Sequence, residues 1–172
     1  MTRKRPLPFD PIDEAARQWA TRWGAVDHMR AVTNVMRVQQ LLLAQLDDLL
    51  RPHGLTFARY EALVLLTFSR AGALPLGKMG DRLQVHPTSV TSIVDRLEAA
   101  GLVARTPHPT DGRTVLAAIT QEGRAVVEAA TRDLVGAEFG LGMLNPDDLA
   151  ALSALLRPVR FAAGDFDELP AP

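Results

Sequence analysis

The chain has 172 residues, of which 47% are hydrophobic and 23% are charged, a composition typical of one globular domain with a buried core. It contains no cysteine, which excludes disulfides, cysteine-ligated zinc and thiol-based redox switching. The net charge of −1 gives no overall attraction to nucleic acid, although it does not exclude a local basic patch.

The chain shows no targeting or membrane segment. The basic start MTRKRP is not followed by an apolar stretch, and no apolar run approaches the roughly 18 residues that span a bilayer. We therefore expect a cytoplasmic protein that does not associate with membranes.

The first part of the chain is predicted to be helical after a loose start. Three prolines interrupt residues 1–11, and Asp10 or Asp13 can then cap a helix with the sequence IDEAARQWATRW. A second helix is expected over residues 26–50. It is long for a small domain and has a broad apolar face, as helices that pair with a partner do.

The next segments predict a helix, a short extended piece and a short helix. LTFARYEALVLLTFSRAG has Thr56 as its expected N-cap and Gly72 beyond its end. LPLGKMGDRLQV then gives the extended piece and a helix around residues 76–83.

Residues 86–120, HPTSVTSIVDRLEAAGLVARTPHPTDGRTVLAAIT, predict a helix followed by a β-hairpin. Pro87 stands in the first turn of the helix and Gly101 stops it. LVART and TVLAAIT are short β-type runs, and the polar loop between them contains Pro, Asp and Gly.

Two further helices are expected after the hairpin. The first is TQEGRAVVEAATRDLVGAEFG, residues 120–140, with Thr120 as its cap. Pro146 then opens PDDLAALSALLRPVRF, and the acidic end of the chain is expected to fray.

A short helix, the tight turn QVHP, a second helix and a hairpin form the layout of a winged helix–turn–helix. The second helix carries hydroxyl groups in its N-terminal half, where such a helix meets DNA, and apolar residues on its opposite face. The segment is only mildly basic, so its charge alone does not decide the function.

These segments resemble the MarR family of winged-helix transcriptional regulators. The similar pieces are TSIVDRLEAAGLV, the DGR of the wing and VLAAITQEG, within roughly residues 28–161. The resemblance implies a mainly α fold (an α+β winged helix) and an obligate homodimer whose first and last helices interleave. It also implies binding to a pseudo-palindromic double-stranded DNA operator, most simply as a repressor released by a small-molecule effector.

The expected organisation has five parts. They are a flexible tail (1–11), two N-terminal helices (12–55), a winged DNA-binding lobe (56–119), C-terminal dimerisation helices (120–163) and a flexible acidic tail (164–172).

The resemblance places the DNA-binding residues on the second helix, the wing and the short helix. Arg113 is expected at the minor groove, whose negative potential suits arginine. Asp111 would orient Arg113 or brace the wing. Arg96 contacts DNA or, alternatively, pairs with Asp95 or another carboxylate. The full candidate set is Lys78, Thr88, Ser89, Thr91, Ser92, Arg96, Asp111 and Arg113.

The first helix is an addition to the minimal family and resembles the urate-responsive branch, which places a Trp beside its effector pocket. Trp19 matches that Trp, although the four-residue spacing to Trp23 also fits simple packing. Glu61 matches an acidic residue of that branch, but Thr67 takes the place of its Arg, so another small anionic or aromatic effector is expected. The candidate effector residues are Trp19, Arg22, Arg30, His53, Arg59 and Glu61.

Other functions find less support in the sequence. The four histidines have no metal-ligand spacing, and no cofactor is expected. GxGxxG, Walker and GxSxG motifs are absent, so an enzyme is not expected. The alternative is a winged-helix protein-interaction module that does not bind specific DNA. Such a module would present an acidic or apolar helix face, whereas this face is hydroxylated.

Overall fold

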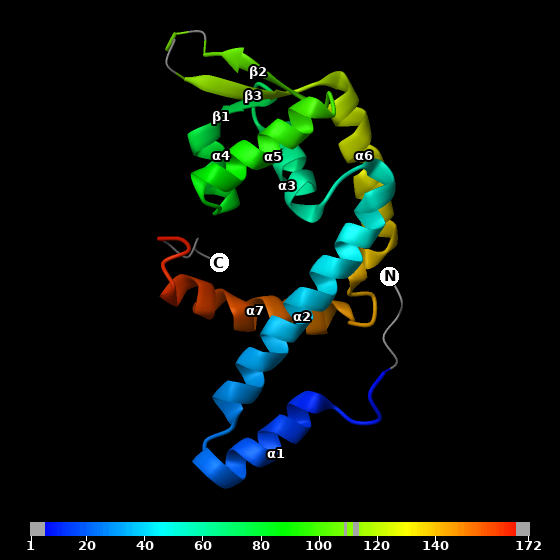
Figure 1. The fold of residues 1–172 in the computed structure, drawn as a ribbon, viewed down its shortest axis with the longest axis vertical. Coiled ribbons are helices and arrows are strands. Elements are labelled where there is room, and N and C mark those ends of the chain that lie inside the picture. The colour runs from blue at the N-terminus through cyan, green and yellow to red at the C-terminus, as the bar shows by residue number, and fades with distance from the viewer. Residues whose placement is uncertain (1–5, 109, 112–113, 168–172) are drawn as a thin grey trace.

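The computed structural model describes residues 6–108, 110–111 and 114–167, and Figure 1 shows a winged lobe from which long helices extend. The helices are α1 (Pro11–Trp23), α2 (Asp27–Leu50), α3 (Phe57–Phe68), α4 (Leu76–Leu83), α5 (Pro87–Ala99), α6 (Gln121–Gly136) and α7 (Pro146–Ala162). The strands are β1 (Ala73–Pro75), β2 (Val103–Pro107) and β3 (Val115–Ile119), and two 3₁₀ turns are η1 (Arg51–His53) and η2 (Glu138–Gly140).

The sheet is antiparallel, with the order β1-β3-β2. The predicted hairpin is confirmed, with Arg105 of β2 opposite Ala117 of β3. The extended piece before α4 becomes a third strand, because Ala73 pairs with Ala118 on the other edge of β3. The wing is therefore joined to the start of the helix–turn–helix through one sheet.

The core of the lobe lies where α3, α4 and α5 pack on this sheet and on α6. Leu63, Leu66 and Met79 are fully buried there. From α5, Val90 and Val94 enter the core, so the opposite, hydroxylated face of this helix is left at the surface, as the sequence predicted.

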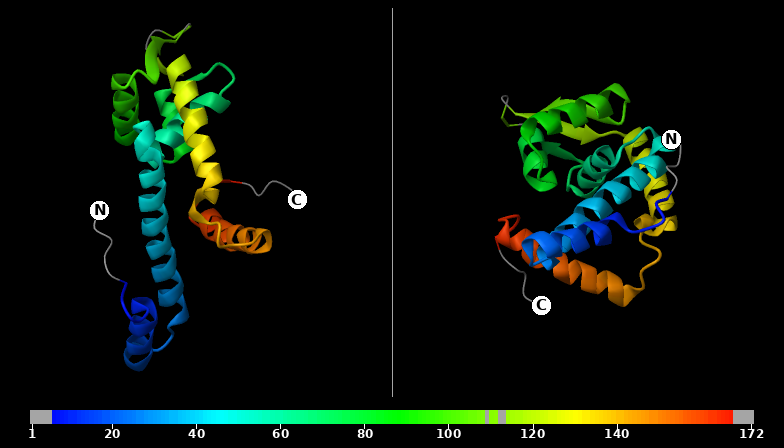
Figure 2. Two further views of the ribbon diagram at one scale, coloured as in Figure 1. Left: turned by 90° about the vertical axis from the view of Figure 1, so that its right-hand side faces the viewer. Right: turned by 60° about the horizontal axis from the view of Figure 1, so that its bottom comes forward.

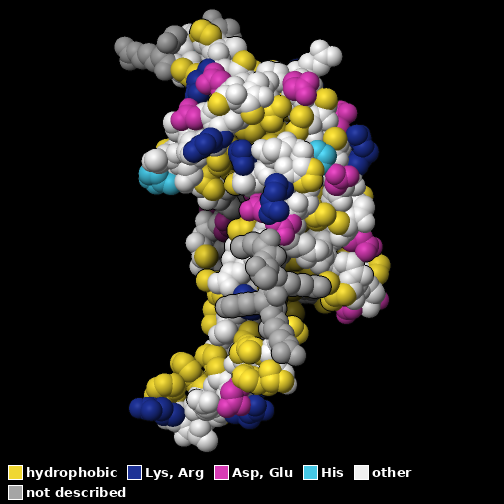
Figure 3. Space-filling view, turned by 45° about the vertical axis from the view of Figure 1, so that its right-hand side comes forward, with side chains coloured by type: hydrophobic (Ala, Val, Ile, Leu, Met, Phe, Trp, Pro, Cys, Tyr) yellow, Lys and Arg dark blue, Asp and Glu magenta, His cyan; other side chains and the backbone are white. Residues whose placement is uncertain are grey.

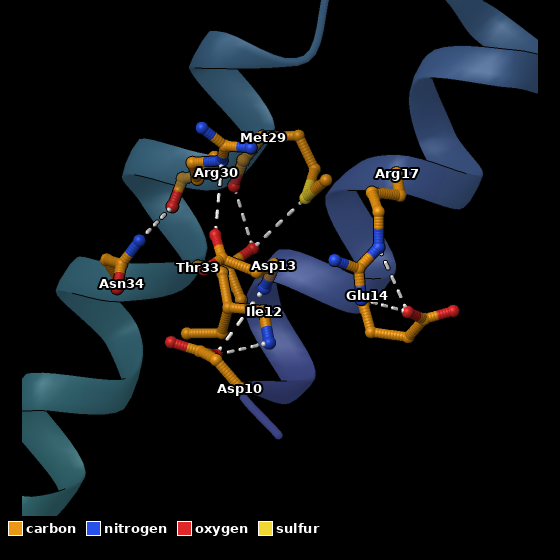
Figure 4. A network of polar contacts seen from close by, with 9 residues as sticks. All are labelled: Asp10, Ile12, Asp13, Glu14, Arg17, Met29, Arg30, Thr33 and Asn34. Carbon is orange, nitrogen blue, oxygen red and sulfur yellow. Dashed lines mark hydrogen bonds and ion pairs between the residues drawn. The ribbon is translucent and has the colours of Figure 1, made fainter.

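The first helix begins as predicted and lies along the start of α2. The Asp10 carboxylate accepts the backbone N–H of Ile12 at 2.8 Å and that of Asp13 at 3.4 Å (Figure 4). Asp13 then forms an ion pair with Arg30 of α2 at 3.7 Å, and Ala16 is buried between the helices. Figure 2 shows α1 and the first half of α2 projecting away from the winged lobe.

Thr56 is the N-cap residue of α3, as predicted, but its side chain accepts no backbone N–H of the helix. The backbone N–H of Phe57 donates instead to the Asp47 carboxylate of α2, at 2.7 Å. The Thr56 hydroxyl accepts from Nε of Arg59 at 3.2 Å. A carboxylate from a neighbouring helix thus accepts a backbone N–H at the start of α3, as the side chain of an N-cap residue usually does. The same hydrogen bond ties α2 to the lobe.

The helix expected to run to residue 140 ends earlier, at Gly136. Glu138 and Phe139 both have φ of +50°, a left-handed conformation that cannot continue a right-handed helix. These residues reverse the chain, so that α7 leaves at a steep angle to α6 (Figure 2). Asn145 then caps α7 by accepting the N–H of Asp148 at 3.0 Å.

The segment expected to be a flexible acidic tail starts with a folded turn. The Asp165 carboxylate accepts from Nε of Arg160 at 2.5 Å, and its backbone N–H donates to the Arg160 carbonyl. The Gln84 side chain, in the turn between α4 and α5, donates to the Asp165 carbonyl at 2.8 Å. The end of α7 is therefore attached to the helix–turn–helix.

Large apolar side chains remain exposed outside the lobe. Figure 3 shows them gathered where α1 meets α2, at the lower end of the molecule. The described residues of α7 include no buried side chain, and Leu155 of that helix is 73% exposed. None of the described helices combines the length and apolar character needed to cross a membrane.

Candidate nucleic-acid interface

The exposed face of α5 carries the hydroxyl groups that the sequence singled out. Thr88, Ser89, Thr91 and Ser92 are all exposed on its N-terminal half. His86 starts the helix, because its Nδ1 accepts the backbone N–H of Thr88 at 3.3 Å. This face therefore presents small polar groups around a helix N-terminus, which can approach phosphates or base edges closely.

Two arginines stand beside this face. An open hollow of about 280 Å³ is lined by Thr56, Arg59, Ser92, Ile93 and Arg96. Arg59, expected near an effector, thus lies with the α5 residues. Arg96 is exposed and has no carboxylate partner among the described residues, so its alternative pairing with Asp95 is not found.

Asp95 pairs instead with Arg105 of β2. Nη2 of Arg105 lies 2.5 Å from Oδ1 of Asp95, and Nη1 contacts the Glu98 carboxylate. The Arg105 backbone N–H also donates to Glu98, at 3.2 Å. The hydrogen bond to Asp95, followed by that to Glu98, raises the pKa of the Arg105 guanidinium. The sequence analysis missed this residue, which joins the wing to α5.

The base of the wing is held by hydrogen bonds. The Thr114 hydroxyl donates to the Asp111 carboxylate at 2.6 Å, and the Thr114 N–H donates to the Asp111 carbonyl at 3.0 Å. Asp111 therefore holds Thr114 at the base of the wing. Arg113 lies outside the described residues.

Lys78 of α4 lines a hollow that α4 forms with the base of the wing. The hollow has a volume of about 670 Å³, and Lys78, Asp81, His108 and Thr114 contribute to its walls. His108 was not a candidate from sequence. The signal in the sequence that could have identified His108 is its position in the polar loop that follows a β-type run.

The N-terminal candidates for effector binding lie where α1 meets the start of α2. The rings of Trp19 and Trp23 are 4.7 Å apart, and the Arg22 guanidinium lies 5.2 Å from the Trp23 ring centroid. Arg30 is held by Asp13. These contacts favour packing of α1 as the role of Trp19.

The remaining effector candidates lie elsewhere. Nε2 of His53 is 2.6 Å from the Asp133 carboxylate of α6, which ties η1 to that helix. Glu61 lies at the surface of α3, and its partial desolvation raises the pKa of its carboxyl group. Among the described residues, the six candidates do not converge on a single pocket.

An open hollow lies between α3 and α6. Its volume is about 380 Å³ and its walls are mostly apolar. The residues that line it are Tyr60, Val64, Thr67, Phe68, Val127, Glu128, Thr131 and Arg132. The Tyr60 and Thr131 hydroxyls are 3.0 Å apart across its base. Tyr60 and Thr131 are 71 residues apart in the sequence, so no local pattern could predict that they line the same hollow.

Comparison with known proteins identifies relatives of this arrangement. The MarR family model matches residues 58–115. An uncharacterized HTH-type transcriptional regulator of Mycobacterium leprae is 41% identical over 68 residues, 40% of this chain and 48% of that protein. The match thus spans about half of that relative's length. The multiple antibiotic resistance protein MarR of Escherichia coli is 32% identical over 66% of this chain and 79% of its own.

Solved structures share the fold. A MarR family transcriptional regulator from Streptomyces coelicolor, Sco5413, is 58% identical, with a TM-score of 0.78 over 84% of this chain and all of that one. A mutant of E. coli MarR complexed with operator DNA is 28% identical, with a TM-score of 0.67 over 74% and 91%. CouR from Rhodococcus jostii, bound to p-coumaroyl-CoA, is 26% identical, with a TM-score of 0.67 over 83% and 96%. The winged lobe, its three-stranded sheet and these similarities together show that the chain belongs to the MarR family.

Proposed function

We propose that this protein is a transcriptional regulator that binds a double-stranded DNA operator as a homodimer and acts as a repressor. The observation that carries the proposal is the exposed hydroxylated face of α5, flanked by Arg59 and Arg96 and set beside a braced wing. Small hydroxyls let a recognition helix enter the major groove, and the flanking guanidinium groups suit phosphates. The operator complex of the MarR relative supports this assignment.

A second copy of the chain is the expected partner of the exposed helices. Val35, Met36 and Leu41 of α2 are each about half exposed or more, and Leu155 and Val159 of α7 are more exposed still. An apolar surface of this kind is typical of an interface that is covered in the functional protein. A two-fold dimer would then match a pseudo-palindromic operator.

The hollow between α3 and α6 is the proposed effector site. Its apolar walls suit an aromatic ring, and Arg132 at its edge offers a positive charge to an anionic group. A ligand there would sit between the lobe and a helix that leads to α7, and would change the separation of the two recognition helices. By linkage, such a ligand weakens DNA binding by the same factor as DNA weakens ligand binding. The ligand-bound CouR relative supports a small-molecule site in this fold.

The DNA-binding proposal is tested by selecting a preferred duplex from a random library and measuring its affinity by fluorescence anisotropy across a salt series. We expect tight, salt-dependent binding that exceeds the affinity for random DNA by about 1,000-fold or more. Arg96→Gln should reduce the slope of affinity against salt by about one phosphate contact. Arg51→Gln, an exposed arginine in η1 away from α5, is the matched control. Equal affinity for selected and random DNA would instead favour the protein-interaction module.

The effector proposal is tested with benzoate as an aromatic anion and benzamide as its neutral match. Benzoate should raise the melting temperature and weaken operator binding in the wild type, and benzamide should do so less. Arg132→Gln should remove the difference between the two compounds. If benzoate acts equally on the variant, Arg132 is not the anion partner.

A further inference from the structure

The exposed stripe of α5 combines groups that favour DNA with groups that oppose it. Thr88, Thr91 and Ser92 are followed on the same face by Asp95 and Glu98, because residues three, four and seven apart share one side of a helix. The Asp95 and Glu98 side chains are 56% and 40% exposed. A duplex lying on this stripe brings its phosphates toward two carboxylates, which repel them.

Arg105 reaches these two carboxylates from outside the helix. It projects from β2, uses one terminal nitrogen for each carboxylate, and adds a backbone N–H to Glu98. Its side chain is 27% exposed, so it is held more firmly than the carboxylates that it contacts. Arg96 follows Asp95 in the sequence but contacts neither carboxylate.

The contact with Arg105 neutralises the net negative charge of α5. The helix α5 carries Asp95, Arg96 and Glu98, a net charge of −1, and Arg105 brings the sum to zero. The ion pairs of Arg105 with Asp95 and Glu98 also connect β2 to α5, so they help to hold the wing in place relative to the helix. Charges at such short range interact strongly even near a protein surface, whereas exposed pairs in isolation contribute little to stability. The contact therefore removes negative charge from the face that a polyanion would approach, and it also ties β2 to α5.

We propose that Arg105 is the counter-ion and positioning residue that makes the acidic part of the recognition helix compatible with DNA. It acts through Asp95 and Glu98 rather than by touching a phosphate. This inference rests on the proposed DNA-binding function and adds to it a specific requirement at the junction of wing and helix.

The test compares four variants on the selected operator. Arg105→Gln is expected to lower affinity about tenfold, because it leaves both carboxylates unneutralised. Asp95→Asn with Glu98→Gln is expected to bind as well as the wild type or better. Combining all three substitutions is expected to restore affinity to within about threefold of the wild type. Arg105→Lys, which keeps the charge, should lose less than Arg105→Gln.

The rescue distinguishes this role from the others. If the triple variant binds as poorly as Arg105→Gln, Arg105 acts directly on DNA or only through the fold of the wing, and the proposal is overturned. Circular dichroism and the melting temperature identify any variant that does not fold. If Arg105→Gln does not fold, the proposal is judged on the operator affinities of Arg105→Lys and of the Asp95→Asn/Glu98→Gln variant. If the wild type itself binds no preferred duplex, the proposed function fails, and that result is separate from the comparison among variants.

Discussion

Asp47 and Asp48 are adjacent in α2 but contribute differently to the fold. Asp47 is partly buried and accepts the first backbone N–H of α3, ten residues away. Asp48 is exposed and pairs with Arg51 at i, i+3 on the helix surface. A carboxylate that satisfies a helix N-terminus is harder to replace than one that forms a solvent-exposed ion pair.

We expect Asp47→Ala to lower the free energy of unfolding by about 1–2 kcal/mol, since it leaves the start of α3 without its cap. Asp48→Ala is the matched control and should cost less than about 0.5 kcal/mol. Urea denaturation followed by circular dichroism measures both. Equal losses would mean that the Asp47 hydrogen bond contributes no more than a surface ion pair.

Glu61 has a pKa raised by partial burial, so its ionised form is less favourable in the folded protein than in the unfolded chain. Protonated Glu61 therefore adds to the free energy of unfolding at pH values below the ordinary range of a glutamate pKa. This contribution is lost as pH rises through the raised folded pKa. Glu61→Gln should not show this loss of stability, because glutamine does not ionise.

At neutral pH we therefore expect Glu61→Gln to be as stable as the wild type or more stable, by less than about 1 kcal/mol because the group is partly solvated. The difference should shrink on acidification below the glutamate range. Melting temperatures from pH 3 to 8 test this. A wild type that outperforms the variant at neutral pH would show that the carboxylate has a stabilising partner.

At the scale of elements, the packing of α6 on the wing depends on a residue without a side chain. A Cβ added at Gly123 would lie 2.1 Å from the Leu102 carbonyl oxygen and 2.9 Å from Ile119 Cγ1. Gly123 also donates its N–H to the Thr120 hydroxyl that caps the helix. The start of α6 therefore approaches the backbone at Leu102, directly before β2, more closely than a residue with a side chain permits.

We expect Gly123→Ala to destabilise the protein by about 1–3 kcal/mol, through overpacking against the backbone. Gly136→Ala is the control in the same helix, because its added Cβ meets nothing within 4 Å. That change should be neutral or stabilising by up to about 1 kcal/mol. Differential scanning calorimetry of the two variants gives the comparison, and similar melting temperatures would contradict the close approach.

The elements that sequence could predict are those fixed by local patterns. Apolar periodicity placed α2 and α5, and prolines and glycines marked the ends of α5 and the hairpin loop. Thr120 was correctly expected to cap α6. The cap from Asp47, the ion pairs of Arg105 and the left-handed turn after Gly136 were missed. Each depends on tertiary contacts or backbone geometry that no local propensity encodes.

The same division applies to the candidate site. The hydroxylated face of α5 follows from helical spacing around Val90 and Val94, and the structure leaves it exposed. The effector residues were chosen by resemblance, and the structure spreads them over α1, α2, η1 and α3. The pocket between α3 and α6 joins residues that sequence distance concealed.

At the scale of the whole molecule, the apolar surface is unevenly distributed. The buried apolar residues of the lobe form one cluster, although Phe68 and Val115 remain exposed. By contrast, α7 buries none of its residues and α2 buries only Leu46 and Leu50, near the lobe. A helix with this pattern has too little packing of its own to account for its length. The second copy proposed above supplies the missing contacts, and it places two α5 helices on one duplex.

We expect Leu155→Glu to weaken the dimer by about 100-fold or more, because each dimer would bury two unpaired carboxylates. Sedimentation at nanomolar to micromolar concentration measures the change, with Gln121→Glu as a control that adds the same charge at the exposed start of α6. Operator affinity should fall in the variant and recover at high protein concentration, since association precedes binding to both half-sites. A variant that stays dimeric, together with an equally unaffected Met36→Glu, would show that another surface joins the copies. The lobe would then bind DNA without the spacing that these helices are expected to set.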